Sequence, residues 1–188
     1  MTYISGQVYS RLDFTKTDFE TAEYEQCTFE YCNFSNLNLK GRMFENCGFK
    51  NCDLSNVKVA DVSFQQVKFD QCKMLGIHFH ASNPFLLEFS FINCQLDYCS
   101  FYNLKIKRSK FLNCRMLEAD FTQTELSASD FQGSDLSGAI FDQSILEKAD
   151  FRNAIHYVID PETNRIKGAR FDLDGLPGLL GKYGIKIS

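Results

Sequence analysis

The sequence lacks several features that would place it in a familiar class of protein. Its 188 residues include no tryptophan, only three prolines and only three histidines. No long apolar run is present, so no transmembrane helix is indicated. The segment from Met1 to Gly6 has neither the basic region nor the apolar core of a secretory signal. We therefore expect a cytoplasmic protein that does not enter a membrane.

Motifs for catalysis and cofactor binding are also missing. His78, His80 and His156 belong to no Ser/His/Asp, Cys/His or zinc motif, and no glycine-rich phosphate loop occurs. We expect no enzyme, no cofactor and no metal site. The net charge of −4 gives no general reason to expect direct binding to nucleic acid or to an acidic membrane.

What the sequence does contain is a strict repeat of five residues. From Phe91 to Phe151 every fifth residue is large and apolar, and a second register from Ile4 to Phe79 behaves in the same way. An α-helix repeats its apolar face at three and four residues and a half-buried strand at two, so neither explains this period. The chain is expected to turn a corner every five residues and to wind as a solenoid. The registers meet within 80–90, where Asn83-Pro84 is a turn signal.

The eight cysteines all lie two positions before a large residue, in a place otherwise filled mostly by small residues. In a secreted chain they would suggest disulfides, but without a signal they indicate reduced thiols or metal ligands. Residues 20 apart share a face, so Cys32, Cys52 and Cys72 form a column that could imitate a metal ladder. Their spacing does not match the short CxxC motif of zinc sites. Core packing is the favoured interpretation, because free cysteine behaves as a small buried apolar residue.

Units such as Ala119-Asp120-Phe121, Ser129-Asp130-Phe131 and Cys52-Asp53-Leu54 show the repeat most clearly. The pattern resembles that of pentapeptide-repeat proteins, whose consensus is Ala-Asp/Asn-Leu/Phe followed by two variable residues. This resemblance implies an all-β fold, a right-handed quadrilateral β-helix with four pentapeptides per coil. The large and small residues would point inward, and the ends of such a rod need covers.

The expected organisation follows the strength of the repeat. Residues 1–171 form the β-helix, interrupted by a loop at 80–90 and by a hairpin at 157–168 around a proline-led turn. Residues 169–171 return to the repeat as a last rung. Residues 172–188 form an apolar segment for capping and dimerisation, with a short helix from about Pro177 to Tyr183 that ends at Gly184.

The layout and the stretch Leu179-Leu180-Gly181-Lys182-Tyr183-Gly184-Ile185 resemble the quinolone-resistance (Qnr-type) and microcin-immunity branch of the family. That resemblance implies a homodimer joined through the C-terminal segment. It also implies binding to a type II topoisomerase, DNA gyrase or topoisomerase IV, and its protection from quinolones or toxins. The expected dimerisation residues are Leu176, Leu179, Leu180, Tyr183 and Ile185.

Acidic residues give the strongest surface signal. Between Glu118 and Asp150 eight acids oppose one lysine, a local net charge of −7. This density approaches that of duplex DNA and predicts a DNA-mimicking face that binds the partner. The residues expected there are Asp120, Glu125, Asp130, Asp135, Asp142 and Asp150. A second acidic stretch covers 13–30, and basic residues around Lys107 separate the two. The alternative is a solvated outer face whose polar residues the repeat itself demands.

The interruption of the repeat gives a second candidate site, formed by Asn83, Phe85, Leu86 and Leu87. Insertions in solenoids usually form surface loops and often bind partners. The alternative is a bulge whose apolar residues fold back onto the rod. For function, the alternative to topoisomerase binding is a generic scaffold with another protein partner. A polysaccharide lyase is a distant third hypothesis, because the phenylalanine-filled interior leaves no clustered catalytic residues.

Overall fold

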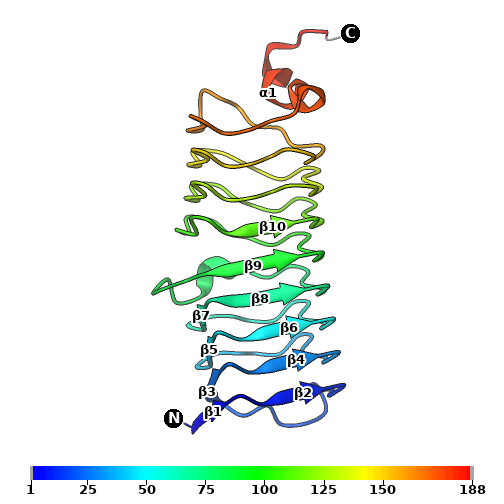
Figure 1. The fold of residues 1–188 in the computed structure, drawn as a ribbon, viewed down its shortest axis with the longest axis vertical. Helices are drawn as coiled ribbons and strands as arrows, with labels where there is room; N and C mark the ends of the chain where they lie inside the picture. The colour runs from blue at the N-terminus through cyan, green and yellow to red at the C-terminus, as the bar shows by residue number, and fades with distance from the viewer. Residues whose placement is uncertain (1, 187–188) are drawn as a thin grey trace.

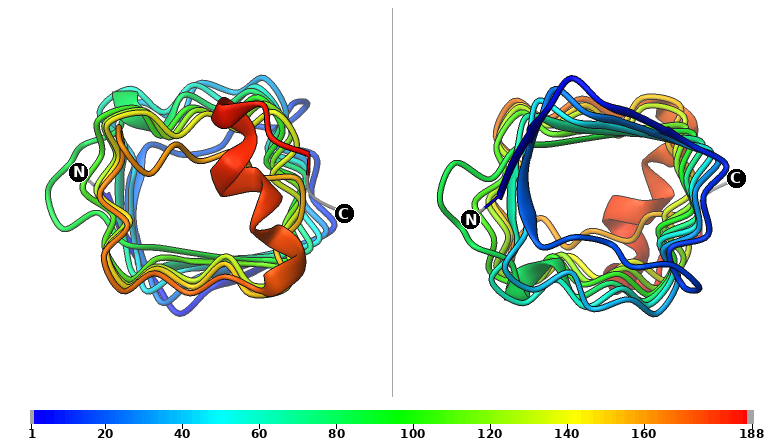
Figure 2. Two further views of the ribbon diagram at one scale, coloured as in Figure 1. Left: turned by 90° about the horizontal axis from the view of Figure 1, so that it is seen from above. Right: turned by 90° about the horizontal axis from the view of Figure 1, so that it is seen from below.

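The protein is a rod in which the chain winds around one axis. The computed structural model describes residues 2–186 (Figure 1). Val8 pairs in parallel with Thr28, so one coil takes 20 residues, or four units of five. Seen along the axis, the stacked coils form a four-sided frame (Figure 2). The predicted all-β quadrilateral β-helix is confirmed.

Two of the four sides carry parallel β-sheets, and both are built from very short strands. The first sheet has the order β1-β3-β5-β7 and the second the order β10-β9-β8-β6-β4-β2. The strands of the first are β1 (Thr2–Ser5), β3 (Ala22–Glu25), β5 (Met43–Glu45) and β7 (Ser63–Gln65). Those of the second are β2 (Val8–Ser10), β4 (Thr28–Glu30), β6 (Gly48–Lys50), β8 (Val67–Asp70), β9 (Phe89–Ile92) and β10 (Lys110–Leu112).

Beyond these strands the ladder continues as single parallel bridges. Ser100 pairs with Asp120, and Asp130 pairs with Asp150. On the side of the second sheet, the last bridge joins Asp150 to Arg170. Residues 169–171 therefore form a rung, as predicted.

The core is a column of stacked aromatic rings. On the side of the second sheet, nine rings from Tyr9 to Phe171 stack in succession with centroid distances of 4.7 to 5.3 Å. Such offset aromatic contacts add to the free energy gained by burying the rings. All eight cysteines are free thiols buried in the same core, in agreement with the core-packing interpretation.

The polar residue of each unit has a structural task at the corner that follows it. The carboxylate of Asp130 accepts a hydrogen bond from the amide of Gln132 at 3.0 Å, and the Asn33 side chain does the same for Ser35 at 3.0 Å. Such Asx turns fix the bend of the chain. The last residue of a unit, two places after the large one, commonly has a positive φ. An example is Asn113 (51°), and asparagine tolerates this conformation well. The recurring acids therefore have a reason to be present that is independent of binding.

The interruption lies where the two registers meet. Val67 pairs with Phe89, 22 residues away instead of 20. The ladder continues to Asn83, whose amide donates to Val62, and resumes at Glu88, whose amide donates to Phe64. Residues 84–87 leave the rod between these points, after the 3₁₀ helix η1 (Phe79–Ala81). The buried ring of Phe89 takes the inward place that the loop vacates, 5.5 Å from the ring of Phe64.

Near the C-terminus the chain differs from the expected hairpin at 157–168. Arg165 pairs in parallel with Ile145, so it belongs to the solenoid ladder, and the amide of Ile159 donates to Gly178 instead of to a facing strand. Residues 156–164 are a wider corner that buries Tyr157, Ile159 and Asn164. The prediction of a hairpin rests on the proline-led turn and the segments 157–159 and 165–167 that flank it, and it is wrong because the flanking side chains pack into the rod instead of against each other.

A cap covers the C-terminal end of the rod. It consists of η2 (Leu173–Gly175), α1 (Pro177–Leu180) and η3 (Gly181–Tyr183), and it ends at Gly184, where φ is 61°. The predicted short helix is therefore confirmed. The helical segment lies across the end of the four-sided frame (Figure 2). Within residues 2–186, no helix is long and apolar enough to cross a membrane.

Candidate protein-interaction surface

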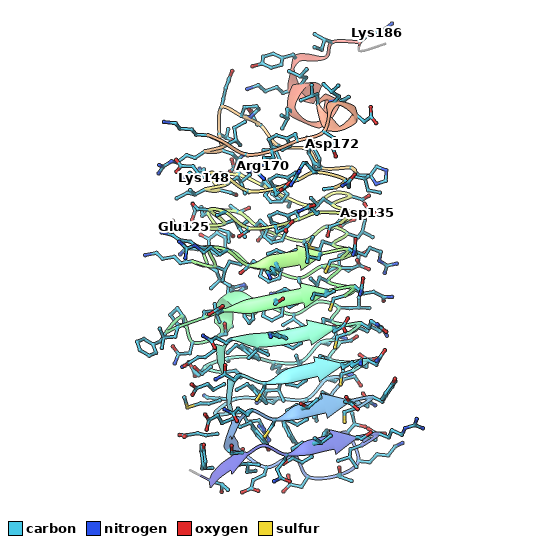
Figure 3. All side chains as sticks on the ribbon, viewed as in Figure 1. Glu125, Asp135, Lys148, Arg170, Asp172 and Lys186 are labelled. Carbon is cyan, nitrogen blue, oxygen red and sulfur yellow. The ribbon has the colours of Figure 1, made fainter. Side chains whose placement is uncertain are left out.

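The six acids expected to form one face are distributed around the rod. Along the axis Asp120 follows Ser100, Glu125 follows Lys105, Asp130 follows Lys110 and Asp135 follows Arg115, and each of these pairs lies on a different side. Figure 3 shows Glu125 and Asp135 on opposite edges of the rod. Each unit of five residues turns one corner, so charges that are adjacent in sequence point in different directions. Only Asp130 and Asp150, which are 20 residues apart, are stacked neighbours.

Several of these acids are engaged by neighbouring side chains. Glu125 lies 2.7 Å from the cation Lys107 and Asp150 lies 2.6 Å from the cation Arg152, whereas Asp135 is hydrogen-bonded to the ring of His156 at 2.9 Å. The hydrogen bond from Arg152 lowers the pKa of Asp150. Burial alone would raise the pKa of Asp135, but hydrogen bonds from Ser137 and His156 lower it. The single acidic face expected from the sequence is therefore not formed by these residues.

Acids without cation partners lie on the side that carries β1, β3, β5 and β7, which we call the loop face because residues 84–87 project from it. Glu25 and Glu45 are register partners in neighbouring strands, and Glu23 and Glu88 share the side. None of the four forms an ion pair within residues 2–186. Comparing residues that are 20 apart in the sequence would have shown that Glu25 and Glu45 stack, whereas counting acids along consecutive residues does not.

The loop exposes two large apolar side chains. Phe85 is 66% exposed and Leu86 is 63% exposed, whereas Leu87 is half-buried against the core. The side chain of Asn83 accepts a hydrogen bond from the amide of Phe85 at 2.9 Å and so fixes the start of the loop. Only Leu87 folds back onto the rod.

An open groove of about 890 Å³ lies between the loop and the loop face. Its walls include Glu45 and Gln65 from the strands, Leu87 from the loop, and Lys105 and Arg108 from the coil on the other side of the loop. It therefore brings together apolar surface and charges of both signs. Groups of three or more potential metal ligands do not occur within residues 2–186.

The C-terminal end has a second exposed apolar surface. Tyr183 is 55% exposed and Ile185 is 56% exposed, and Leu176 is also exposed, whereas Leu179 and Leu180 are half-buried. The cap is held to the rod by Lys182, which lies 2.6 Å from Asp160 and 2.7 Å from Glu162. The five residues expected at a dimer interface thus lie together at this end. Leu179 also packs against the core.

These features define a β-solenoid with a side loop, a charged groove and an apolar end. Two sequence profiles agree with this architecture: "Pentapeptide repeat region" matches residues 86–155 and "Pentapeptide repeats (8 copies)" matches residues 25–59. The chain belongs to the pentapeptide-repeat family. No curated protein sequence matches it.

Solved structures with the same fold include QnrB1, described as a plasmid-mediated fluoroquinolone resistance protein. A trypsin-treated form of QnrB1 is 20% identical, with a TM-score of 0.65 over 100% of this chain and 98% of that chain. The full-length form is 19% identical, with a TM-score of 0.54 over 97% of this chain and 100% of that chain. At this identity the similarity establishes the fold along the whole rod.

Proposed function

We propose that this protein is a non-enzymatic binding protein of type II topoisomerase, DNA gyrase or topoisomerase IV, and that it protects the enzyme from quinolones or toxins. The observation that carries the proposal is the fold similarity to QnrB1 over the full length of both chains. The proposed target also implies a cytoplasmic location. A loop on one side of the rod and an apolar end supply surfaces for a partner and for a second copy.

In this proposal the acidic side chains imitate the phosphates of DNA and meet a basic DNA-binding surface of the enzyme. The acids of the loop face support this role best, because they are uncompensated and also lie together on one side of the rod. Of the acids expected from the sequence, Asp120, Asp130 and Asp142 also lack ion pairs within residues 2–186 and can contribute. The loop residues Asn83, Phe85, Leu86 and Leu87 would add shape-specific contacts.

The proposed homodimer forms through the C-terminal cap. Leu176, Tyr183 and Ile185 expose apolar surface at the end of the rod, where burial in an interface is favourable. Light scattering of a chain ending at Phe171 should show a monomer or aggregates. An unchanged dimer would place the interface elsewhere.

The deciding experiment is a gyrase supercoiling assay with a quinolone, titrated with the purified protein. We expect supercoiling to be restored in a dose-dependent manner, and we expect direct binding to the enzyme to weaken as salt is raised. Heat-denatured protein is the control. If neither gyrase nor topoisomerase IV is bound or protected at any dose, the proposal is wrong.

A second candidate function is a scaffold for another protein. The ion pairs of Glu125 and Asp150 favour it, because they reduce the uncompensated negative charge of the C-terminal half of the rod and so its likeness to DNA. A pull-down from bacterial lysate that returns a different reproducible partner and no topoisomerase subunit would support this function.

A further inference from the structure

The loop face changes its charge at the loop. On the N-terminal side it carries Glu23, Glu25 and Glu45, and Glu88 stands at the boundary directly after the loop. Arg42, which precedes β5, is buried. On the C-terminal side, the units that continue the same face carry six cations and two acids. The cations are Lys105, Lys107, Arg108, Lys148, Arg165 and Lys167, and the acids are Glu125 and Glu147.

Ion pairs make the difference in charge between the two halves of the loop face clearer. Both acids on the C-terminal side are neutralised, Glu125 by Lys107 at 2.7 Å and Glu147 by Arg165 at 2.7 Å. Lys105 and Arg108 form no ion pair within residues 2–186. Figure 3 shows Glu125 and Lys148 on the same edge of the rod, above the loop. One half of the face is therefore acidic and the other half basic.

Glu25 and Glu45 are an unfavourable pair of neighbours. They occupy the same register position in adjacent parallel strands, where like charges destabilise a sheet. The only hydrogen bond to either carboxylate within residues 2–186 comes from the hydroxyl of Tyr3 to Glu25. Because other outward positions of the repeat hold serine, glutamine or threonine, the fold does not require acids here. A partner that supplies cations would offset the repulsion.

The exposed apolar side chains stand at the boundary between the two halves. Phe85 and Leu86 project from the rod there, and the groove beneath them contains Glu45 on one side and Lys105 and Arg108 on the other. Central apolar anchors with charged surroundings are typical of the energetic centre of a protein interface.

We propose that the loop face docks a partner polypeptide in one orientation. An apolar pocket of the partner would accept Phe85 and Leu86, basic residues would face Glu25 and Glu45, and acidic residues would face Lys105 and Arg108. A uniformly basic surface would be repelled by the second half, so a DNA-binding surface fits only the N-terminal half of the face. Charge complementarity of this kind selects the orientation and speeds association.

This inference rests on the proposed function, because the partner used to test it is DNA gyrase. Binding of gyrase would be measured by calorimetry for the wild type and three double variants: Glu25→Lys with Glu45→Lys, Lys105→Glu with Arg108→Glu, and Phe85→Ser with Leu86→Ser. We expect each to weaken binding at least about tenfold, since two charge contacts or two anchors are lost. All six side chains lie on the surface, and circular dichroism would verify the fold.

The matched controls make the same changes of charge on the side of the second sheet. They are Glu30→Lys with Asp70→Lys, and Lys50→Glu with Lys68→Glu, four positions that form no ion pairs within residues 2–186. We expect these controls to bind within about threefold of the wild type, because screening limits distant charges.

Loop-face variants that bind like the controls would overturn this inference and leave the proposed function intact. Tighter binding by the Lys105→Glu, Arg108→Glu variant would also overturn it, because the partner would then be uniformly basic. If the wild type itself binds neither gyrase nor topoisomerase IV, the proposed function is wrong, and the docking inference with it.

Discussion

The guanidinium group of Arg42 lies over the ring of Phe19, 4.9 Å from its centroid. Arg42 occupies the small position of its unit, where other units hold alanine, cysteine or valine, and it is buried. Its nitrogens donate to the carbonyl oxygens of Phe19, of Glu20 at 3.1 Å and of Asn38 at 3.2 Å. This burial lowers the pKa of Arg42. The side chain replaces ladder hydrogen bonds where the first coil is irregular.

Replacing Arg42 with methionine should therefore destabilise the protein. The apolar volume is retained, but three carbonyl groups lose a charged donor, and we expect a loss of about 3 kcal/mol in the free energy of unfolding. Urea unfolding followed by circular dichroism measures it. Lys40→Met is the control, because Lys40 is exposed and its 3.8 Å pair with Asp61 should contribute less than about 1 kcal/mol. Equal effects of the two substitutions would contradict this role of Arg42.

Two glycines of the cap allow a matched comparison. A Cβ atom on Gly178 would lie 2.2 Å from the carbonyl oxygen of Tyr157, whereas one on Gly181 would meet nothing within 4 Å. Gly178→Ala should loosen the cap at a cost of about 1–3 kcal/mol. Gly181→Ala should be neutral or stabilise the cap by up to about 1 kcal/mol, because alanine favours helix.

Hydrogen exchange at Ile159 reports this difference directly, because its amide donates to the carbonyl oxygen of Gly178 at 3.0 Å. We expect faster exchange in Gly178→Ala and unchanged or slower exchange in Gly181→Ala. The same exchange rate in both variants would show that the contact with Tyr157 does not hold the cap.

The sequence alone predicted the parts of the fold that the five-residue period governs. The inward column from Phe91 to Phe151 and the change of register before it both follow from which residues are large. The helix after Pro177 was also recognisable from proline and glycine signals. The corner at 156–164 was not, because there the period places the exposed His156 at the inward position, and Tyr157, one residue later, enters the core instead.

The surface was harder to predict than the core. Acids such as Asp120, Glu125 and Asp130 are concentrated along the chain, but the winding places them on different sides of the rod. Neutralisation also depends on side chains of neighbouring coils, such as Lys107 for Glu125, 18 residues away, and Arg165 for Glu147. Conversely, Glu25 and Glu45 become neighbours only when coils stack. Residue contacts across coils, not local composition, determine the surface charge.

The buried cysteines should be unreactive while the protein is folded. Burial raises the pKa of Cys47 and of Cys99 to about 12, so at neutral pH these thiols are protonated as well as inaccessible. Iodoacetamide followed by mass spectrometry should find none of the eight cysteines alkylated under native conditions and all of them alkylated in urea. In the control variant Lys58→Cys, one exposed thiol should react at once. Rapid native labelling of Cys47 or Cys99 would contradict the buried positions.

The carboxylate of Asp13 should titrate unusually low. It lies 2.8 Å from Lys16, accepts hydrogen bonds from Thr15 at 2.6 and 3.1 Å, and has a pKa of about 2, mainly because of the hydrogen bond from Lys16. A depressed carboxyl pKa stabilises the folded state above the unfolded value of roughly 4. That contribution is lost as the pH falls from about 4 through 2.

Carbon-detected NMR should show the Asp13 carboxyl titrating near pH 2 and, in Lys16→Met, moving toward pH 4, because the main stabilising partner is gone. In Asp13→Asn, stability should fall less steeply between pH 4 and 2, since the group that takes up the proton is absent. High salt should act in the same direction as Lys16→Met, because the pair is exposed and screened. A wild-type midpoint near pH 4 would show that the Lys16 contact does not persist in solution.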